Sequence, residues 1–131
     1  MPNHMFILYV ADQARARAFY NRILGVEPSL DVPGMTEYAL SDGVSLGLLP
    51  YSGMAGILGD HVPNPASGQG IPRCELYLFV DDPQDAIEHL VAEGGKLIAP
   101  PARRSWGDIA AYGADLDGHI IAFAKHISLS A

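Results

Sequence analysis

The sequence contains an internal repeat, and this repeat restricts the possible folds more than any other feature. Three matched pairs keep one offset along the chain: Val10 with Val80, Asp12 with Asp82, and Gly25 with Gly95. An Asp-Gly pair, the strongest short signal for a β-hairpin, follows in each half at residues 42–43 and 117–118. A unit of this size cannot bury both faces of its sheet alone, so we expect two similar modules rather than unrelated halves.

Each copy is predicted to run strand, helix, strand, strand, strand. In the second copy, apolar Leu76, Leu78 and Val80 alternate with Glu75, Tyr77 and Phe79, the period of a strand with two different faces. Asp82 is a suitable N-cap, and Pro83 suits the first helical position. The first expected helix is capped by Asp12, runs through Leu24 and ends at Gly25, and the second covers 83–93. The other expected strands are 5–10, 26–32, 35–41, 44–49, 96–99, 109–114 and 119–126, with Pro100 and Pro101 as an interruption.

The chain of 131 residues is long enough for one domain, which we divide into a module over 4–50, a connecting arm over 51–72 and a module over 73–127. The arm is rich in glycine and proline, and its first part, 51–58, can form a turn or two of helix. One side of each sheet takes the helix. The other side is expected to face the partner copy, another subunit or a ligand cavity.

Composition excludes several kinds of partner. The net charge of −7 argues against nucleic acid and anionic membranes. No apolar run is long enough to span a membrane, and the N-terminus lacks the features of a signal peptide. Cys74 is the single cysteine, which fits a reducing compartment, so we expect a cytoplasmic protein. Alternation places Cys74 on the helix side as a small core residue.

The arrangement resembles the vicinal oxygen chelate superfamily, which includes glyoxalase I, extradiol dioxygenases, fosfomycin resistance enzymes and bleomycin resistance proteins. The resemblance rests on residues 10–12, Phe19-Tyr20 and Leu24-Gly25, and on the run 115–119 before the last strand. It implies an α+β fold in which two βαβββ modules form a curved mixed sheet with a concave open face and helices outside. It also implies a homodimer and a small-molecule ligand, although this fold hosts several reactions.

Enzymes of that superfamily hold a divalent cation on the open face, and the resemblance places the ligands at four positions of this chain: Met5, Gly47, Glu75 and Ala122. Only Glu75 carries a good ligand for such a cation, because a thioether suits hard cations poorly. His4 is one residue out of place and points to the opposite face. His119 sits at a turn where a structural role is favoured. We therefore predict no metal site and no cofactor, with one divalent metal as the alternative.

Alternate residues on the predicted open face are mostly apolar, with two phenols and one carboxylate, a mixture that suits an organic ligand. Small residues at 47 and 122 are expected to leave room there. The predicted ligand-binding residues are Tyr9, Gly47, Met54, Glu75, Tyr77, Arg104, Trp106 and Tyr112. The same side chains could instead pack a dimer interface or the core.

The sequence thus favours a protein similar to metal-free bleomycin-resistance-like binding proteins, which binds a small planar or amphipathic molecule and sequesters a drug or metabolite. Glu75 is the one candidate catalytic residue of the chain, but this residue alone does not establish a catalytic role. The alternative is a metal-dependent lyase, isomerase or dioxygenase that uses Glu75. A third possibility is a structural or regulatory dimer without a ligand.

Overall fold

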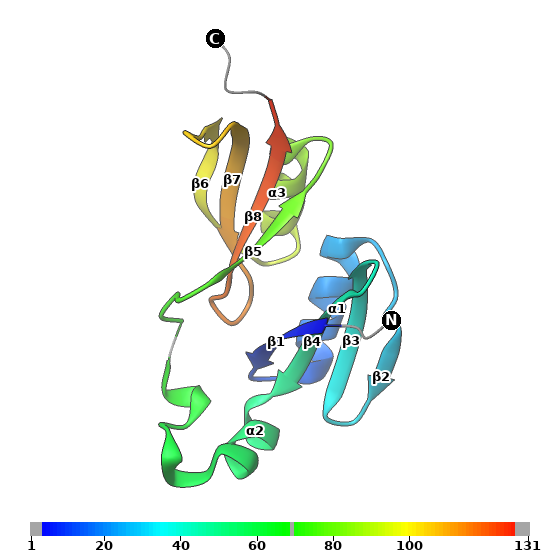
Figure 1. Cartoon of the computed structure of the whole chain (residues 1–131), viewed down its shortest axis with the longest axis vertical. Coiled ribbons are helices and arrows are strands. Elements are labelled where there is room, and N and C mark those ends of the chain that lie inside the picture. Colours follow the sequence, from blue (N-terminus) through cyan, green and yellow to red (C-terminus); the bar gives the residue numbers. More distant parts are fainter. Residues whose placement is uncertain (1–3, 69, 128–131) are drawn as a thin grey trace. The chain divides into compact units, whose positions relative to one another are not determined.

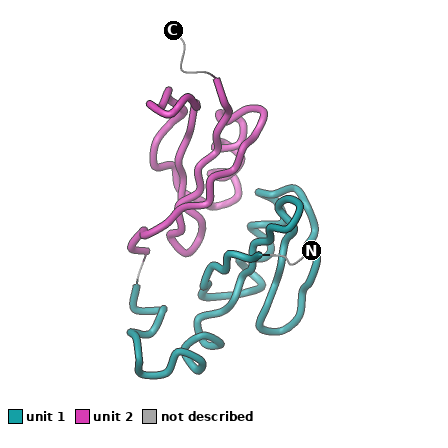
Figure 2. The backbone as a smooth tube through the Cα atoms, viewed as in Figure 1, with its two compact units in different colours: residues 1–69 teal, residues 70–131 magenta. Residues whose placement is uncertain are grey.

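The computed structural model describes residues 4–68 and 70–127. The chain divides into two compact units, residues 1–69 and 70–131 (Figure 2). Each unit holds a four-stranded mixed sheet with a helix on one of its faces (Figure 1). The predicted α+β class and the two βαβββ modules are confirmed.

The first unit follows the predicted order of elements. Its elements are β1 (His4–Val10), α1 (Gln13–Leu24), β2 (Leu30–Val32), β3 (Met35–Ser41) and β4 (Val44–Pro50). The strand order is β1-β4-β3-β2, with β1 parallel to β4 and the other pairs antiparallel. The parallel pair is possible because α1 provides the crossover between the two strands.

Helix α1 begins and ends where the sequence signals predict. The Asp12 carboxylate accepts a hydrogen bond of 3.0 Å from the Arg15 amide, and Gly25 ends the helix in the left-handed conformation at φ 69°. Phe19 and Tyr20 are buried and lie edge to face, with ring centroids 5.3 Å apart. Burial of two aromatic side chains fixes which face of α1 lies against the sheet.

The short strand β2 is attached to the first unit by polar contacts. The Gln13 amide donates to the Val32 carbonyl at 2.8 Å and to the Thr36 hydroxyl at 2.9 Å, and Thr36 in turn donates to Asp31 at 2.9 Å. Thr36 is fully buried, so these bonds satisfy a polar group inside the unit. The predicted strand over 26–32 was wrong in extent: β2 covers only 30–32, and Pro28, which has no N–H, lies outside it.

The second unit repeats the architecture. Its elements are β5 (Glu75–Phe79), α3 (Pro83–Ala92), β6 (Lys96–Arg103), β7 (Asp108–Ala114) and β8 (Ile120–His126), in the sheet order β5-β8-β7-β6. Asp82 caps α3 by accepting from the Gln84 and Asp85 amides. Close packing of the helix depends on glycine, because a Cβ at Gly113 would lie 2.9 Å from side-chain atoms of both Ile87 and Leu90.

Two sequence predictions for the second unit were wrong. Strand β6 runs through Pro100 and Pro101 to Arg103, with shifts in its register to β7 between Leu97 and Ala102. Because β6 is an edge strand, prolines are tolerated there without the loss of a central ladder bond. Cys74 is exposed rather than buried, since it precedes the first paired residue of β5.

The connecting segment contains α2 (Tyr51–Leu58), as predicted, followed by two short 3₁₀ turns, η1 (Gly59–His61) and η2 (Pro65–Gly68). Helix α2 contacts β1 and β4 of its own unit but buries none of its residues completely. No helix within the described residues is long and apolar enough to span a membrane.

Candidate functional site

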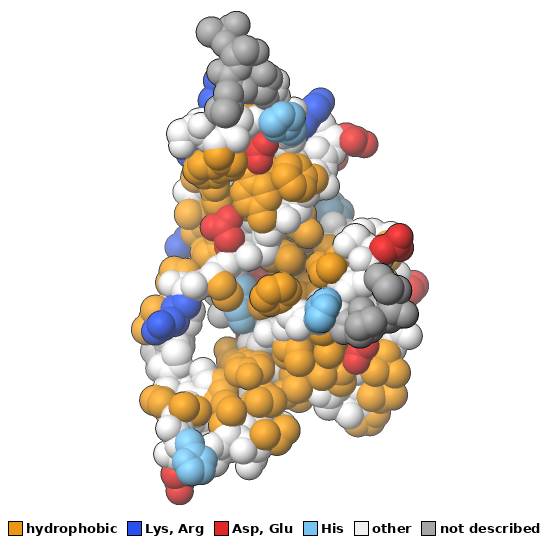
Figure 3. All heavy atoms as spheres, in the orientation of Figure 1, with side chains coloured by type: hydrophobic (Ala, Val, Ile, Leu, Met, Phe, Trp, Pro, Cys, Tyr) orange, Lys and Arg blue, Asp and Glu red, His pale blue; other side chains and the backbone are white. Residues whose placement is uncertain are grey.

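The sheet of the second unit has one face that α3 does not cover, and we call it the open face. Strand register places three residues of β5, Glu75, Tyr77 and Phe79, beside alternate residues of β8 and β7. Those residues are Ile120, Ala122 and Ala124 of β8, and Ala114, Tyr112 and Ala110 of β7. Figure 3 shows hydrophobic side chains gathered over this unit with acidic side chains among them.

The open face has a floor of small residues beneath larger aromatic ones. Ala110, Ala122 and Ala124 are fully buried. Phe79 remains 68% exposed and Trp106, in the loop before β7, 52% exposed. The Tyr77 and Phe79 rings meet edge to face at a centroid distance of 5.4 Å. Exposed aromatic rings that are packed together offer a ligand apolar contact area without further ordering.

A chain of hydrogen bonds holds the polar side chains of the open face in place. The Trp106 indole nitrogen donates to the Tyr77 hydroxyl at 2.8 Å, and that hydroxyl donates to Asp108 Oδ2 at 2.6 Å. The other Asp108 oxygen lies 3.1 Å from Nδ1 of His126, its register partner on β8. The Asp108 side chain is only 8% exposed, so these partners satisfy a carboxylate that water hardly reaches.

The chain of bonds also sets the protonation of its members. The hydrogen bond from Tyr77 is the main cause that lowers the pKa of Asp108, with help from His126 and against the effect of burial. Burial raises the pKa of Tyr77, and the hydrogen bond to Asp108 raises it further. Asp108 is therefore ionised and Tyr77 keeps its proton at neutral pH.

Arg104, which follows β6, contacts β7 of the open face rather than Glu75. Its Nη2 and Nε atoms donate to the Ala110 carbonyl at 3.0 and 3.3 Å, and the guanidinium lies 5.1 Å from the Tyr112 ring centroid. Burial raises the pKa of Tyr112, and the charge of Glu75 adds to that rise. The backbone of Glu75 pairs with β8, but its exposed side chain has neither a hydrogen bond nor an ion pair among the described residues.

The predicted ligand-binding residues fall into two sets. Glu75, Tyr77, Arg104, Trp106 and Tyr112 lie together in the second unit, and Tyr9, Gly47 and Met54 belong to the first. The prediction that Gly47 leaves room is wrong, because a Cβ there would lie 3.1 Å from side-chain atoms of Met5 and Ile7. Met54 is half-buried on α2, and Tyr9 is half-buried on β1.

A hollow of about 230 Å³ also occurs in the first unit. It lies between the end of α2 and the start of η2, lined by Leu58, Val62 and Pro65 among others. Within the described residues this hollow brings together no titratable group except Asp60, which is exposed. Its lining therefore offers less chemistry than the open face of the second unit.

The relationship to known proteins agrees with the two-module fold. The family model described as the Glyoxalase/Bleomycin resistance protein/Dioxygenase superfamily matches residues 2–123. The chain belongs to this superfamily.

Several solved structures resemble the chain over most of its length. A glyoxalase-related enzyme from Fulvimarina pelagi is 25% identical over 93% of this chain and 86% of that one, with a TM-score of 0.78. A protein from Agrobacterium tumefaciens solved by NMR is 25% identical over 98% and 99% of the two chains, with a TM-score of 0.74. A superfamily enzyme from Burkholderia phytofirmans is 15% identical over 94% and 97%, with a TM-score of 0.79, and shows the fold alone. A search of proteins with curated functions finds no match.

The four positions that the resemblance assigns to metal ligands do not carry a fitting donor set in this chain. In the first unit the two positions hold Met5 and Gly47, and the space beside Gly47 is occupied by apolar side chains. In the second unit Glu75 offers a carboxylate, whereas Ala122 has no ligand atom and is fully buried. One carboxylate is far short of the several hard ligands that hold a divalent cation.

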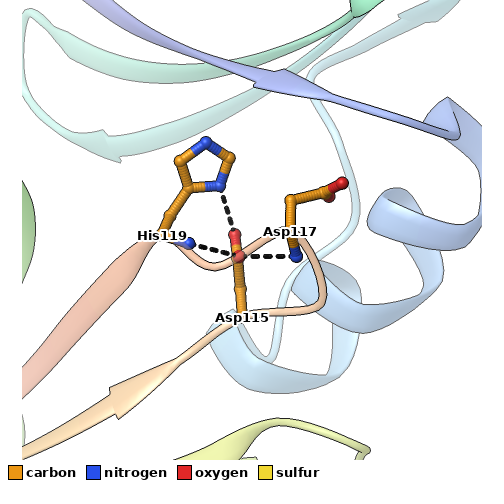
Figure 4. A group of neighbouring side chains, drawn as sticks. All are labelled: Asp115, Asp117 and His119. Carbon is orange, nitrogen blue, oxygen red and sulfur yellow. Dashed lines mark hydrogen bonds and ion pairs between the residues drawn. The ribbon is translucent and has the colours of Figure 1, made fainter. Parts of the chain in front are cut away.

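The turn between β7 and β8 gathers Asp115, Asp117 and His119 (Figure 4). Asp115 accepts hydrogen bonds from the Asp117 and His119 amides, and its other oxygen lies 2.8 Å from Nδ1 of His119. Burial alone would lower the pKa of His119, but the hydrogen bond and charge of Asp115 outweigh it and raise that pKa. These contacts hold the turn together, in keeping with the structural role favoured for His119.

Sequence reasoning missed Asp108 and its bond to His126. The strand was expected to begin at Ile109, which left Asp108 in the loop, whereas β7 begins at Asp108. His126 is exposed, yet it is the register partner of Asp108 on β8. Extending the period of β7 by one residue would have placed Asp108 on the same face as Ala110 and Tyr112.

Proposed function

We propose that the protein binds a small planar or amphipathic organic molecule on the open face of its second unit and needs no metal to do so. The observation that carries this proposal is the orientation of Trp106. Its indole N–H is bonded to Tyr77, which is bonded to the buried Asp108, while about half of its surface stays exposed. An aromatic ring that is exposed and already oriented loses little conformational entropy when a ligand stacks on it.

The surroundings of Trp106 support the same function. Phe79 adds a second exposed ring, and the alanine floor lets both rings stand above the sheet. Apolar area with a few oriented polar groups is the usual composition of an organic ligand site. Sequestration of a drug or metabolite in the cytoplasm is the role we infer for such a binding protein.

A second function is a metal-dependent lyase, isomerase or dioxygenase that uses Glu75. The specific observation in its favour is that Glu75 is exposed on the open face and has no partner among the described residues. The weakness of this alternative is the chemistry of Met5, Gly47 and Ala122, which supply no oxygen or nitrogen ligand from their side chains.

We also propose that the chain forms a homodimer. Strand β1 exposes Phe6 to 76% and leaves Met5 and Ile7 more than one-third exposed. Large exposed apolar side chains on an edge strand are typical of surfaces that other chains cover. Light scattering after size-exclusion chromatography should give twice the mass of one chain, and the mass of a single chain at micromolar concentration contradicts the proposal.

Thermal shift against a panel of planar aromatic compounds tests the binding function. We expect at least one compound to raise the melting temperature of the protein and of Val91→Ala, an exposed position on α3, but not of Trp106→Ala. Unchanged binding to Trp106→Ala would contradict the proposed site. Metal analysis of the purified protein decides between the two functions, because a stoichiometric divalent ion that is lost in Glu75→Ala supports the enzyme.

A further inference from the structure

The hydrogen bonds of the open face have a fixed direction, and this direction limits what a ligand can offer. An ionised carboxylate such as Asp108 only accepts, and an indole nitrogen only donates. Tyr77 therefore gives its single proton to Asp108 at 2.6 Å and accepts from Trp106 at 2.8 Å. A phenolic oxygen can accept more than one hydrogen bond, and no other donor among the described residues reaches this one. Tyr77 can still accept a bond, but it has no proton left to give.

The donors around Trp106 are held away from the Tyr77 oxygen or already bonded to it. Trp106 has one N–H, which is bonded to Tyr77. Arg104 has five N–H groups, of which two are directed to the Ala110 carbonyl, and its guanidinium lies over Tyr112. Tyr112 is separated from Tyr77 by Ala122 on the intervening strand, a distance of about 10 Å between strands. Beside the indole nitrogen, the polar atom that a ligand meets is therefore the Tyr77 oxygen, which is an acceptor.

The negative charges near Tyr77 support the same conclusion as the hydrogen bonds. Asp108 is buried beneath Trp106 and Tyr77 and carries a negative charge, and Glu75 adds an exposed carboxylate on the same strand face. A ligand carboxylate or phosphate at the Tyr77 oxygen would lie near the Asp108 charge and would find no proton there to accept. This position therefore disfavours anions, whereas the Arg104 cation lies over Tyr112, beyond Ala122 on the intervening strand.

Resting on the proposed function, we propose that this face selects planar aromatic molecules that carry a neutral O–H or N–H group on the ring edge. The ring stacks on the exposed indole of Trp106, and its O–H or N–H donates to the Tyr77 oxygen. The Tyr77 oxygen lies beside the edge of the indole ring, since it accepts from the indole nitrogen. A stacked ring of similar size therefore has its own edge next to this acceptor.

Three naphthalenes that share one ring system test the selection: 2-naphthol, which donates, 2-methoxynaphthalene, which cannot, and 2-naphthoate, an anion. The chain has a single tryptophan, so the indole N–H resonance in an NMR titration reports Trp106 without ambiguity. We expect 2-naphthol to bind about 2- to 10-fold more tightly than its methyl ether, the value of one net hydrogen bond, and 2-naphthoate most weakly. If apolar contact alone decided affinity, the methyl ether would bind more tightly than the phenol, which would overturn the inference.

Single substitutions test whether the Tyr77 oxygen causes the preference for 2-naphthol over its methyl ether. Tyr77→Phe should bind 2-naphthol and its methyl ether equally, whereas Val91→Ala, at an exposed position on α3, should keep the preference of the natural protein. Circular dichroism verifies that both variants fold. Retained preference in Tyr77→Phe overturns the inference.

The two proposals fail in different ways. Equal binding of 2-naphthol and its methyl ether, both lost in Trp106→Ala, overturns the selection and leaves the binding function standing. If none of the three naphthalenes moves the Trp106 resonance, the face does not bind planar rings and both proposals are wrong.

Discussion

The open faces of the two units are built on the same strand pattern and differ in chemistry. In the first unit, the space beside Gly47 on β4 is filled by Met5, Ile7 and Met35. In the second unit, Ala122 on the equivalent strand β8 lies between Tyr77 and Tyr112, and polar groups join across the sheet. The comparison teaches that a repeated fold can hold a polar network on one copy while apolar side chains fill the equivalent position of the other.

The polar side chains of the first unit are used elsewhere. Gln13, Thr36 and Asp31 attach the short strand β2 to helix α1, and Thr36 is fully buried in that network. In the second unit, Asp108 instead joins Tyr77 and His126 on the uncovered face. One network therefore stabilises the fold, and the other orients an exposed aromatic ring.

The largest expected effect is on binding. Trp106→Ala should weaken the affinity of a planar ligand at least tenfold, because truncation removes the stacking surface of the open face. Isothermal titration calorimetry measures the change, and Val91→Ala on α3 is the matched control. Less than a twofold change in Trp106→Ala would show that the second unit's face is not the binding surface.

Glycine substitutions compare packing in the two units. Gly113→Ala should lower the free energy of unfolding by about 1–3 kcal/mol, since its Cβ would meet Ile87 and Leu90 at 2.9 Å and the Lys96 carbonyl at 3.0 Å. Gly47→Ala should cost less than about 1 kcal/mol, because it meets the ends of flexible side chains. Urea denaturation measures both, and a larger cost at Gly47 would contradict the difference drawn between the units.

Thr36→Val tests whether the first unit's network is purely structural. We expect a loss of about 1–2 kcal/mol in the free energy of unfolding, because Gln13 and Asp31 each lose a hydrogen-bond partner. Ligand affinity and the Trp106 indole resonance should stay unchanged. A shift of that resonance would mean that the network also acts on the binding face.

The smallest effect is the pH dependence of the turn at His119. Its pKa is raised in the folded protein, so its charged form stabilises the fold fully below the ordinary pKa of 6.5, and this contribution is lost as pH rises through the raised value. His119→Gln should therefore destabilise the protein more at pH 6 than at pH 9, by less than about 1 kcal/mol. Melting temperatures at the two pH values check the sign, and an equal loss at both would show that the charge contributes nothing.

Periodicity predicted the parts of the site that lie inside regular strands. Alternation in β5 placed Glu75, Tyr77 and Phe79 on one face, and the Asp-Gly turns predicted the hairpins that bring β7 beside β8. The helix caps at Asp12 and Asp82 were predicted from local signals, because a cap depends only on residues within one turn.

What the sequence could not predict depends on register and on side-chain direction. Asp108 lies at the first position of β7, where the strand period gives its face but not its partner, and only pairing with β8 brings it to His126. Gly47 was expected to leave room on its face of the sheet. Alternation predicts which face a residue lies on, but it does not predict how far neighbouring side chains such as Met5 and Met35 extend over that residue. The bond between Trp106 and Tyr77 joins residues far apart in the sequence, with no local pattern to indicate it.

The central claim is that the second unit's open face alone binds the ligand, and NMR mapping tests it most directly. Titration of the ¹⁵N-labelled protein with 2-naphthol should shift the Trp106 indole N–H and the backbone amides of β7 and β8, while the amides of β4 stay in place. Shifts confined to β4 and β1, with the Trp106 resonance unmoved, would contradict the claim and assign binding to the first unit.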